Sequence, residues 1–113
     1  MVIINVENSD VIMVELNCVT LNASNCDDVY EGLSRVIKKA RQIVIDISSM
    51  EIMDSSGLGT LLNFYRDLKA LGGTMTVVAV NPLILSLFQL VHFNQIIKIH
   101  RDVPKAVEYL KAS

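Results

Sequence analysis

The sequence has few charged residues and few cysteines. Only 19% of its 113 residues are charged, and the net charge is -2, with both signs mixed along the chain. It lacks the basic stripe that neutralises a phosphate backbone, so we expect no direct binding of nucleic acid. The two cysteines, Cys18 and Cys26, have no second cysteine pair or suitably spaced histidine nearby. We therefore expect free, buried or half-buried thiols, with no metal site and no cofactor.

A long hydrophobic run is also missing. The longest apolar stretch, residues 83–93, is interrupted by Ser86, Gln89 and His92. It is far shorter than the ~20 apolar residues of a membrane-spanning helix. Residues 1–7 lack the basic region, the apolar stretch and the cleavage site of a signal peptide. These observations predict a cytoplasmic protein without a membrane span.

Apolar residues are abundant instead, and their spacing predicts an α/β fold. They make up 51% of the chain, enough for one well-filled domain over residues 1–113. Branched runs predict strands at residues 2–6, 11–16, 43–47, 75–80 and 96–99. Helical spacing predicts four helices, at residues 27–41, about 54–71, 82–90 and about 103–110.

The order of these elements predicts a mostly parallel sheet. Turn-forming residues at 8–10 join the first two strands into an antiparallel hairpin. The later strands alternate with helices, which implies right-handed parallel crossovers. We expect one mixed sheet of about five strands with about four helices on its faces. Functional residues in such sheets gather in loops at the carboxyl ends of the strands.

The loop after the strand at residues 43–47 is the strongest candidate for function. It leads into Asp54, Ser55, Ser56 and Gly57 at the start of a helix. Free backbone N–H groups and the positive end of the helix dipole are expected at this position, where they favour an added phosphate. The alternative is that Asp54 and the serines only cap the helix. Gly57 and Gly59 are unfavourable in a first helical turn, so they need a compensating reason, and close approach of another backbone or a partner is one such reason.

Three chemical activities are poorly supported by the same loop. Nucleotide binding by the Gly57–Gly59 pair is disfavoured, because the third glycine of the dinucleotide fingerprint is absent and no Gly-Lys-Ser/Thr follows. A serine hydrolase of the elbow type needs a glycine two residues before its nucleophile, but Met53 occupies that position relative to Ser55. The reaction also needs a base, and the candidates His92 and His100 are better explained as surface or capping residues. A phospho-aspartate receiver needs an acidic Mg²⁺ cluster that the N-terminal strands lack. We expect no enzyme activity.

Residues 44–59, Val-Ile-Asp-Ile-Ser-Ser-Met-Glu-Ile-Met-Asp-Ser-Ser-Gly-Leu-Gly, strongly resemble the signature of the STAS domain, the family of sulfate-transporter and anti-sigma-factor-antagonist modules. The likeness continues through residues 71–73, 81–82, 87–88 and 96–97, and before residue 43 it rests on pattern alone. It implies a bacterial anti-sigma factor antagonist that acts by partner switching. The unmodified protein would bind an anti-sigma factor that is also a serine kinase, phosphorylation would end binding, and a PP2C-type phosphatase would restore it.

The resemblance also implies roles for individual residues. Ser55 matches the phosphorylated serine, with Ser56 as the fallback. The docking edge would comprise Asn22, Ile52, Met53, Asp54, Ser56, Gly57 and Leu58. Ile52 and Met53 are equally well explained as core residues turned inward.

Two departures from the family pattern concern partner recognition. The family often has a Gly-x-Leu-Asp segment whose aspartate lies near the phosphorylated serine, and here residues 19–22 read Val-Thr-Leu-Asn. Asn22 keeps hydrogen-bonding capacity but lacks the carboxylate. The family's common glycine near His92 is also absent. Neither the particular partner nor the oligomeric state follows from the sequence.

Two other functions remain open at this point. In the first, the chain is a non-switching STAS subunit of a membrane-associated transport or stress-signalling complex, with Ser55 only as a helix cap. In the second, the serine loop binds a small ligand, which would raise the melting temperature by mass action.

Overall fold

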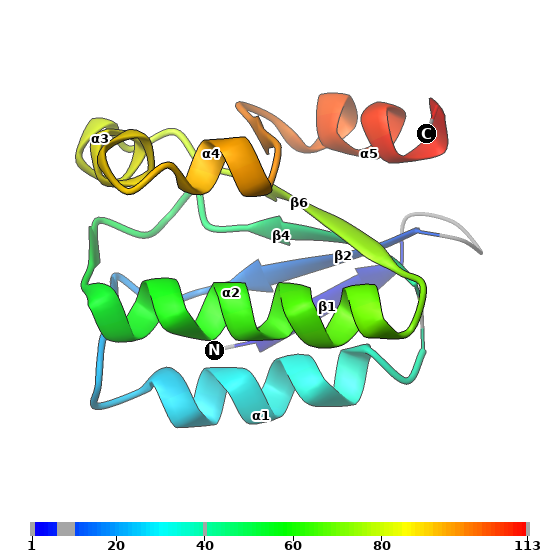
Figure 1. The fold of residues 1–113 in the computed structure, drawn as a ribbon, viewed down its shortest axis with the longest axis horizontal. Coiled ribbons are helices and arrows are strands. Elements are labelled where there is room, and N and C mark those ends of the chain that lie inside the picture. The colour runs from blue at the N-terminus through cyan, green and yellow to red at the C-terminus, as the bar shows by residue number, and fades with distance from the viewer. Residues whose placement is uncertain (1, 7–10, 40, 113) are drawn as a thin grey trace.

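A computed structural model describes residues 2–6, 11–39 and 41–112. Its elements are, in chain order, β1 (Val2–Val6), β2 (Val11–Leu16), β3 (Thr20–Leu21), α1 (Cys26–Val36), β4 (Gln42–Asp46), β5 (Ile52–Met53), α2 (Ser55–Ala70), β6 (Thr74–Val78), α3 (Pro82–Leu90), α4 (Phe93–Ile96), β7 (Ile99–His100) and α5 (Val103–Ala112). Figure 1 shows a central sheet with helices on both sides, which confirms the α/β expectation. The expected turn at residues 8–10 lies outside the described residues.

The main sheet has the strand order β1-β2-β4-β6-β7, with β4 at its centre. β1 and β2 pair antiparallel, and the three following pairs are parallel. The expected antiparallel pairing of the first two strands and the mostly parallel sheet are therefore confirmed. Because β2, β4 and β6 run in the same direction, their carboxyl ends meet at one edge of the sheet, where the serine loop leaves β4.

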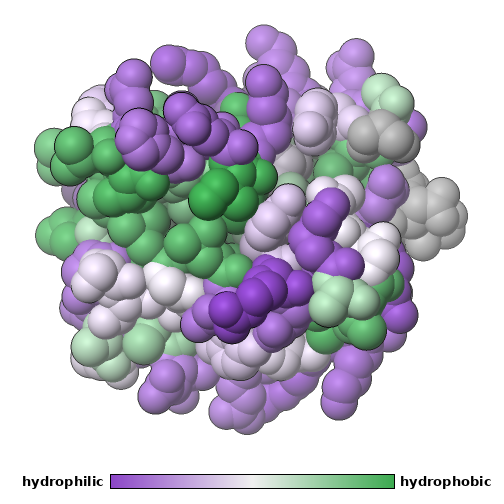
Figure 2. All heavy atoms as spheres, viewed as in Figure 1, coloured by the Kyte–Doolittle hydropathy of each residue, from purple (hydrophilic) through white to green (hydrophobic). Residues whose placement is uncertain are grey.

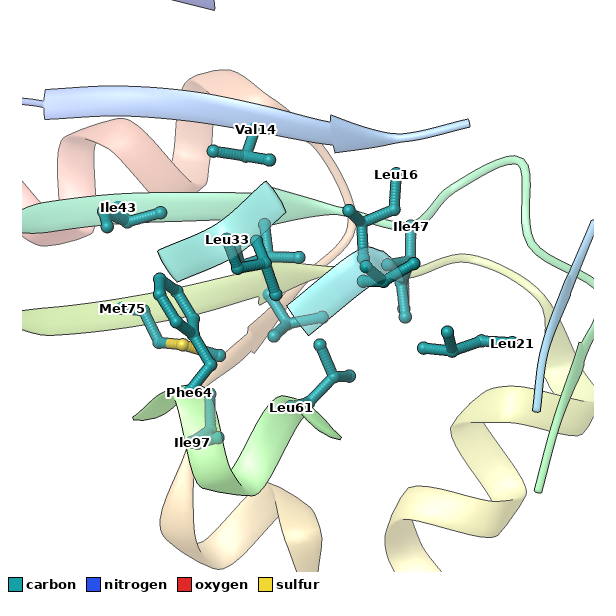
Figure 3. Packing of buried hydrophobic residues seen from close by; sticks show 14 of the residues in the cluster. Val14, Leu16, Leu21, Leu33, Ile43, Ile47, Leu61, Phe64, Met75 and Ile97 are labelled. Carbon is teal, nitrogen blue, oxygen red and sulfur yellow. The ribbon is translucent and has the colours of Figure 1, made fainter. Parts of the chain in front are cut away.

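Successive residues of β4 face opposite sides of the sheet. Ile43 and Ile45 belong to a large core with α1 and α2, whereas Val44 belongs to a smaller core with α5. Figure 3 shows Leu33 of α1 and Leu61 of α2 directed at the strand side chains of the larger core. Both faces of β4 are buried, which explains its nearly continuous hydrophobic sequence.

The helix expected at residues 27–41 is shorter in the structure. α1 ends at Val36, and the Lys39 amide donates a 2.8 Å hydrogen bond to the Val36 carbonyl, three residues back. This tighter turn ends the regular helix. The Arg41 guanidinium donates a 2.8 Å hydrogen bond to the Ile37 carbonyl, so a basic side chain satisfies an orphan acceptor beyond the helix end.

The strand expected at residues 96–99 is displaced by a helical turn. Phe93 and Ile97 are both buried at helical spacing, and the Ile97 amide donates to the Phe93 carbonyl at 3.0 Å. The Phe93 ring also stacks on Phe88, with centroids 4.2 Å apart. This packing favours α4, one short helix more than expected, and the strand β7 follows only at Ile99–His100.

The expected end of α2 and start of α3 are confirmed, whereas β6 ends at Val78, two residues before the end of the expected strand at 75–80. α2 ends before Gly72, whose φ of 81° is left-handed, and Asn81 caps α3 with Pro82 in its first turn. Cys18 and Cys26 are free and half-buried. No helix formed by the described residues is both long and apolar enough to cross a membrane.

Candidate functional site

The serine loop begins where β4 ends in a buried aspartate. The Asp46 carboxylate accepts a 2.9 Å hydrogen bond from the Ser48 amide, which turns the chain out of the sheet. Met50 is fully buried and fixes the middle of the loop to the core. Both the start and the middle of the loop are therefore held against the core before the chain reaches Asp54.

A second, two-stranded sheet joins this loop to the segment before α1. β3 and β5 pair in parallel, with Thr20 opposite Ile52 and Leu21 opposite Met53. The Asp54 amide extends this pairing with a 3.2 Å hydrogen bond to the Leu21 carbonyl. Sequence reasoning missed this sheet, because strands of two residues carry no periodicity. It places residues 19–22 directly beside the start of α2.

The pairing of β3 with β5 places the side chains of Ile52 and Met53 on opposite sides. Neighbouring residues of a strand face opposite sides. The Ile52 side chain is 56% exposed, whereas Met53 is 8% exposed and belongs to the core. Ile52 is thus available to a partner, and Met53 supports the loop from inside.

Asp54 caps α2 with its carboxylate. Its Oδ1 accepts hydrogen bonds from the amides of Ser56 at 2.9 Å and Gly57 at 3.1 Å. Capping at this site is confirmed, with Asp54 as the capping residue. The expectation of free N–H groups is wrong for these two amides, because the Asp54 carboxylate already occupies them. A phosphate on Ser55 would lie beside this carboxylate.

Ser55 is the first residue of α2, and its side chain is exposed. Its hydroxyl has no hydrogen-bond partner among the residues that the structure describes. Ser56 is half-buried, with its carbonyl accepting a 3.0 Å hydrogen bond from the Thr60 hydroxyl. Of the two serines, Ser55 is the more accessible to an enzyme.

Gly57 lies where two backbones approach each other. A Cβ at this position would lie 2.8 Å from the Leu21 carbonyl oxygen and 2.8 Å from Met53 Cγ. The expected close approach is therefore present at Gly57, and it locks α2 against β3. Gly59 has no such neighbour within 4 Å of the corresponding position. Leu58, 8% exposed, also packs in the core.

Asn22 organises the turn that leads into α1. Its Oδ1 accepts hydrogen bonds from the Ser24 amide at 2.9 Å and the Ser24 hydroxyl at 2.6 Å. The Asn22 carbonyl also accepts from the Cys26 amide at 2.9 Å. The Asn22 side chain is half-buried. Its backbone lies close to the serine loop, because the preceding residue, Leu21, pairs with Met53.

An apolar groove of about 190 Å³ lies between β5 and α3. It is lined by Glu51, Ile52, Met53, Leu83, Ile84 and Leu87. Figure 2 shows apolar residues gathered on the side where α3 and α4 lie in Figure 1. Among the described residues that line the groove, only Glu51 has a charged group. The groove adjoins the exposed Ile52 two positions before the capping residue of α2, and no sequence pattern indicated it.

The two histidines lie in other settings. His92 is exposed and follows α3, with a left-handed φ of 61°. His100 lies in β7, 5.0 Å from the Tyr109 ring between centroids, and burial lowers its pKa. Among the described residues, no group of three metal-binding side chains is found.

A family model of the STAS domain matches residues 3–106, so the chain belongs to the STAS domain family. It is 31% identical over 74 residues to the anti-sigma F factor antagonist of Paenibacillus polymyxa. That match covers 66% of this chain and 63% of the relative. The chain thus spans less than two thirds of the length of this curated relative.

Solved structures share the fold at low sequence identity. An anti-sigma factor antagonist from Mycobacterium paratuberculosis has a TM-score of 0.89 at 18% identity, covering 98% of this chain and 93% of that one. SpoIIAA in its unphosphorylated form has a TM-score of 0.81 at 17% identity, covering 100% and 98%. The phosphorylated form of SpoIIAA from Bacillus has a TM-score of 0.73 at 18% identity, covering 97% and 99%.

Proposed function

We propose that this chain is a cytoplasmic anti-sigma factor antagonist that switches partners through phosphorylation of Ser55. Unphosphorylated, it binds an anti-sigma factor with serine kinase activity and so frees a sigma factor for transcription. The observation that carries this proposal is the exposed Ser55 hydroxyl at the start of α2, directly after the Asp54 cap. Family membership and the similarity to anti-sigma factor antagonists support it.

The exposed residues of the site support docking around Ser55. Ile52 offers an apolar contact, while Asp54 and Ser56 offer polar ones. Buried Met53, Gly57 and Leu58 act by holding the loop and α2 in place. Asn22 contributes its side-chain amide from the adjacent turn, where its Oδ1 is already bonded to Ser24.

Phosphorylation would change the interface more than the fold. The Ser55 hydroxyl loses its proton to the kinase as its oxygen takes the γ-phosphoryl group of ATP, and ADP leaves. A PP2C-type phosphatase then uses water to return the phosphoserine to serine and inorganic phosphate. The phosphate adds about -1.5 to -2 charge. With the amides of Ser56 and Gly57 already bonded to Asp54, this charge faces the partner beside another carboxylate. Burying it against a partner costs desolvation and repulsion, which releases the kinase.

Affinity capture from the native host tests this proposal. With ATP or ADP present, we expect the unmodified chain and Ser55→Ala to retain a serine kinase, and Ser55→Asp to lose it. Asn63→Asp is the matched control, because it adds the same charge to an exposed position of α2. Ser56→Asp distinguishes the two serines. All variants must show the same far-UV circular dichroism and melting temperature.

Two outcomes would count against partner switching. If neither the unmodified chain nor Ser55→Ala retains a kinase, the proposed partner does not exist. If the unmodified chain and Ser55→Asp capture the same membrane complex, Ser55 is only a surface residue at a helix start, and the chain is a constitutive subunit of that complex.

A further inference from the structure

The outward face of α3 is apolar and uncovered. Leu83 is 73% exposed and Leu90 is 77% exposed, and half-buried Leu87 lies between them. Their i, i+4, i+7 spacing places the three leucines in one stripe along the helix. Leu83 and Leu87 also line the groove beside β5. A contiguous exposed stripe of this kind marks an interaction surface.

This surface is almost free of charge. Residues 70–97, which contain α3 and α4, include no lysine, arginine, aspartate or glutamate. The centres of interfaces between identical subunits are apolar and depleted of charged residues. A neutral face also meets a copy of itself without like-charge repulsion. The charge distribution therefore favours a second copy of the chain as the occupant.

The geometry of α3 is self-complementary about a two-fold axis. α3 has nine residues, a length of about 14 Å at 1.5 Å per residue. When two copies of α3 pack antiparallel, Leu90 of each lies opposite Leu83 of the other, and exposed Ser86 lies near the axis. A serine there permits close approach. Leu90 of the second copy then reaches the groove of about 190 Å³, which has room for an aliphatic side chain.

The ends of α3 also favour the antiparallel arrangement. Glu51 lines the groove that Leu83 borders, near the start of α3, and His92 follows the end of α3. Antiparallel packing brings Glu51 of one copy toward His92 of the other, where an imidazole N–H can donate to the carboxylate. Parallel packing would bring the two Glu51 carboxylates toward each other instead.

We infer that the chain forms a symmetric homodimer through antiparallel α3 helices, with Leu90 of each copy seated in the groove of the other. This inference goes beyond the proposed function and does not depend on it. Ile52, two positions before the Asp54 cap, also lines the groove, so a second copy seated there covers the exposed Ile52 side chain. A protein partner that binds at Ser55 therefore competes with the second copy for the same face.

Sedimentation equilibrium of the purified chain tests the dimer directly. A pair of single helices forms a small interface, so the average mass should rise from one chain toward two between about 10 µM and about 1 mM. Leu90→Glu should weaken the dimer at least about tenfold, because it places a charge in the groove next to Glu51 of the other copy. Leu90→Lys should weaken the dimer less, since the ammonium faces that carboxylate.

Leu71→Glu is the matched control. Leu71 is 51% exposed and directly follows α2. Figure 1 shows that this end of α2 lies farther from α3 than its start, so the Leu71→Glu variant should dimerise like the unmodified chain. Equal melting temperatures establish that all variants are folded. A constant mass of one chain at every concentration overturns the inference, and the face is then left for a different protein. Equal weakening by Leu90→Glu and Leu71→Glu, or by Leu90→Glu and Leu90→Lys, overturns the proposed arrangement.

Discussion

Asp54 and Ser55 are neighbours with different structural roles. The Asp54 carboxylate accepts two backbone hydrogen bonds that stabilise the start of α2, whereas the Ser55 side chain is exposed. Asp54→Ala should therefore lower the free energy of unfolding by about 1 kcal/mol, as loss of a helix cap does. Asp54→Asn, which keeps the accepting oxygen, should lose much less. Urea unfolding monitored by circular dichroism measures both, and equal losses in the two variants would contradict the capping role.

The two glycines at the start of α2 should respond oppositely to alanine. In Gly57→Ala the new methyl group meets the Leu21 carbonyl oxygen at 2.8 Å, and a backbone atom in a paired strand cannot easily move. We expect a loss of about 1–3 kcal/mol, as for overpacking in a core. Gly59→Ala has open space and should gain up to ~1 kcal/mol from helix propensity. The same urea experiment compares them, and a stabilised Gly57→Ala variant would refute the close packing of α2 on β3.

His92 joins α3 to α4 in a conformation that glycine adopts more easily. Its φ of 61° and ψ of 25° are left-handed. His92→Val should lower the free energy of unfolding by about 1–2 kcal/mol, because a branched side chain is strained there. His92→Gly should leave it unchanged or higher. Unfolding at concentrations where the chain is monomeric measures this difference, and equal stability of the two variants would contradict the left-handed backbone.

The sequence predicted the long elements and missed the short ones, for a physical reason. α2 and α3 have periodic apolar residues and glycine or asparagine signals at their ends, and β4 is a branched run, so local pattern and tertiary packing agree. β3 and β5 have two residues each and exist only because they pair with each other. Likewise, α4 depends on the packing of Phe93 against Phe88, which lies in another helix.

In the candidate site too, some features could be predicted from the sequence and others could not. The position of Ser55 at the start of a helix follows from the residues around it, and the close approach at Gly57 was expected from its cost in a helix. The orientation of Ile52 and Met53 depends on the register of β5 with β3, which no local pattern specifies. The groove depends on the distance between β5 and α3, which are far apart in sequence, so only the folded chain reveals it.

The layer formed by α5 includes a contact with a histidine whose pKa is lowered, His100. α5 covers the face of the smaller core, and His100 at the edge of that layer lies against Tyr109 of α5. Burial lowers the pKa of His100, and the positive charge of Lys98 lowers it further, while Asp102 acts in the opposite direction. The His100 Nε2 atom is buried and has no hydrogen-bond partner among the described residues. Protonation of this ring is therefore less favourable in the folded chain than in the unfolded chain.

The sign of the resulting pH dependence follows by linkage. Above the ordinary histidine pKa of about 6.5 neither state binds this proton, and the contribution of His100 to stability is fully present. As the pH falls below that value the unfolded chain binds the proton first, so the free energy of unfolding decreases until the pH reaches the lower folded-state pKa. His100→Phe keeps an aromatic ring against Tyr109 but removes the proton site, so its stability should change less between about pH 8 and pH 5. His92→Asn is the control, because His92 is exposed and asparagine tolerates its backbone conformation. Urea unfolding at a series of pH values should show the free energy of unfolding falling steeply as the pH falls for the unmodified chain and for His92→Asn, and less steeply for His100→Phe. If the free energy falls equally in all three proteins, the stability of α5 is not coupled to the charge of His100.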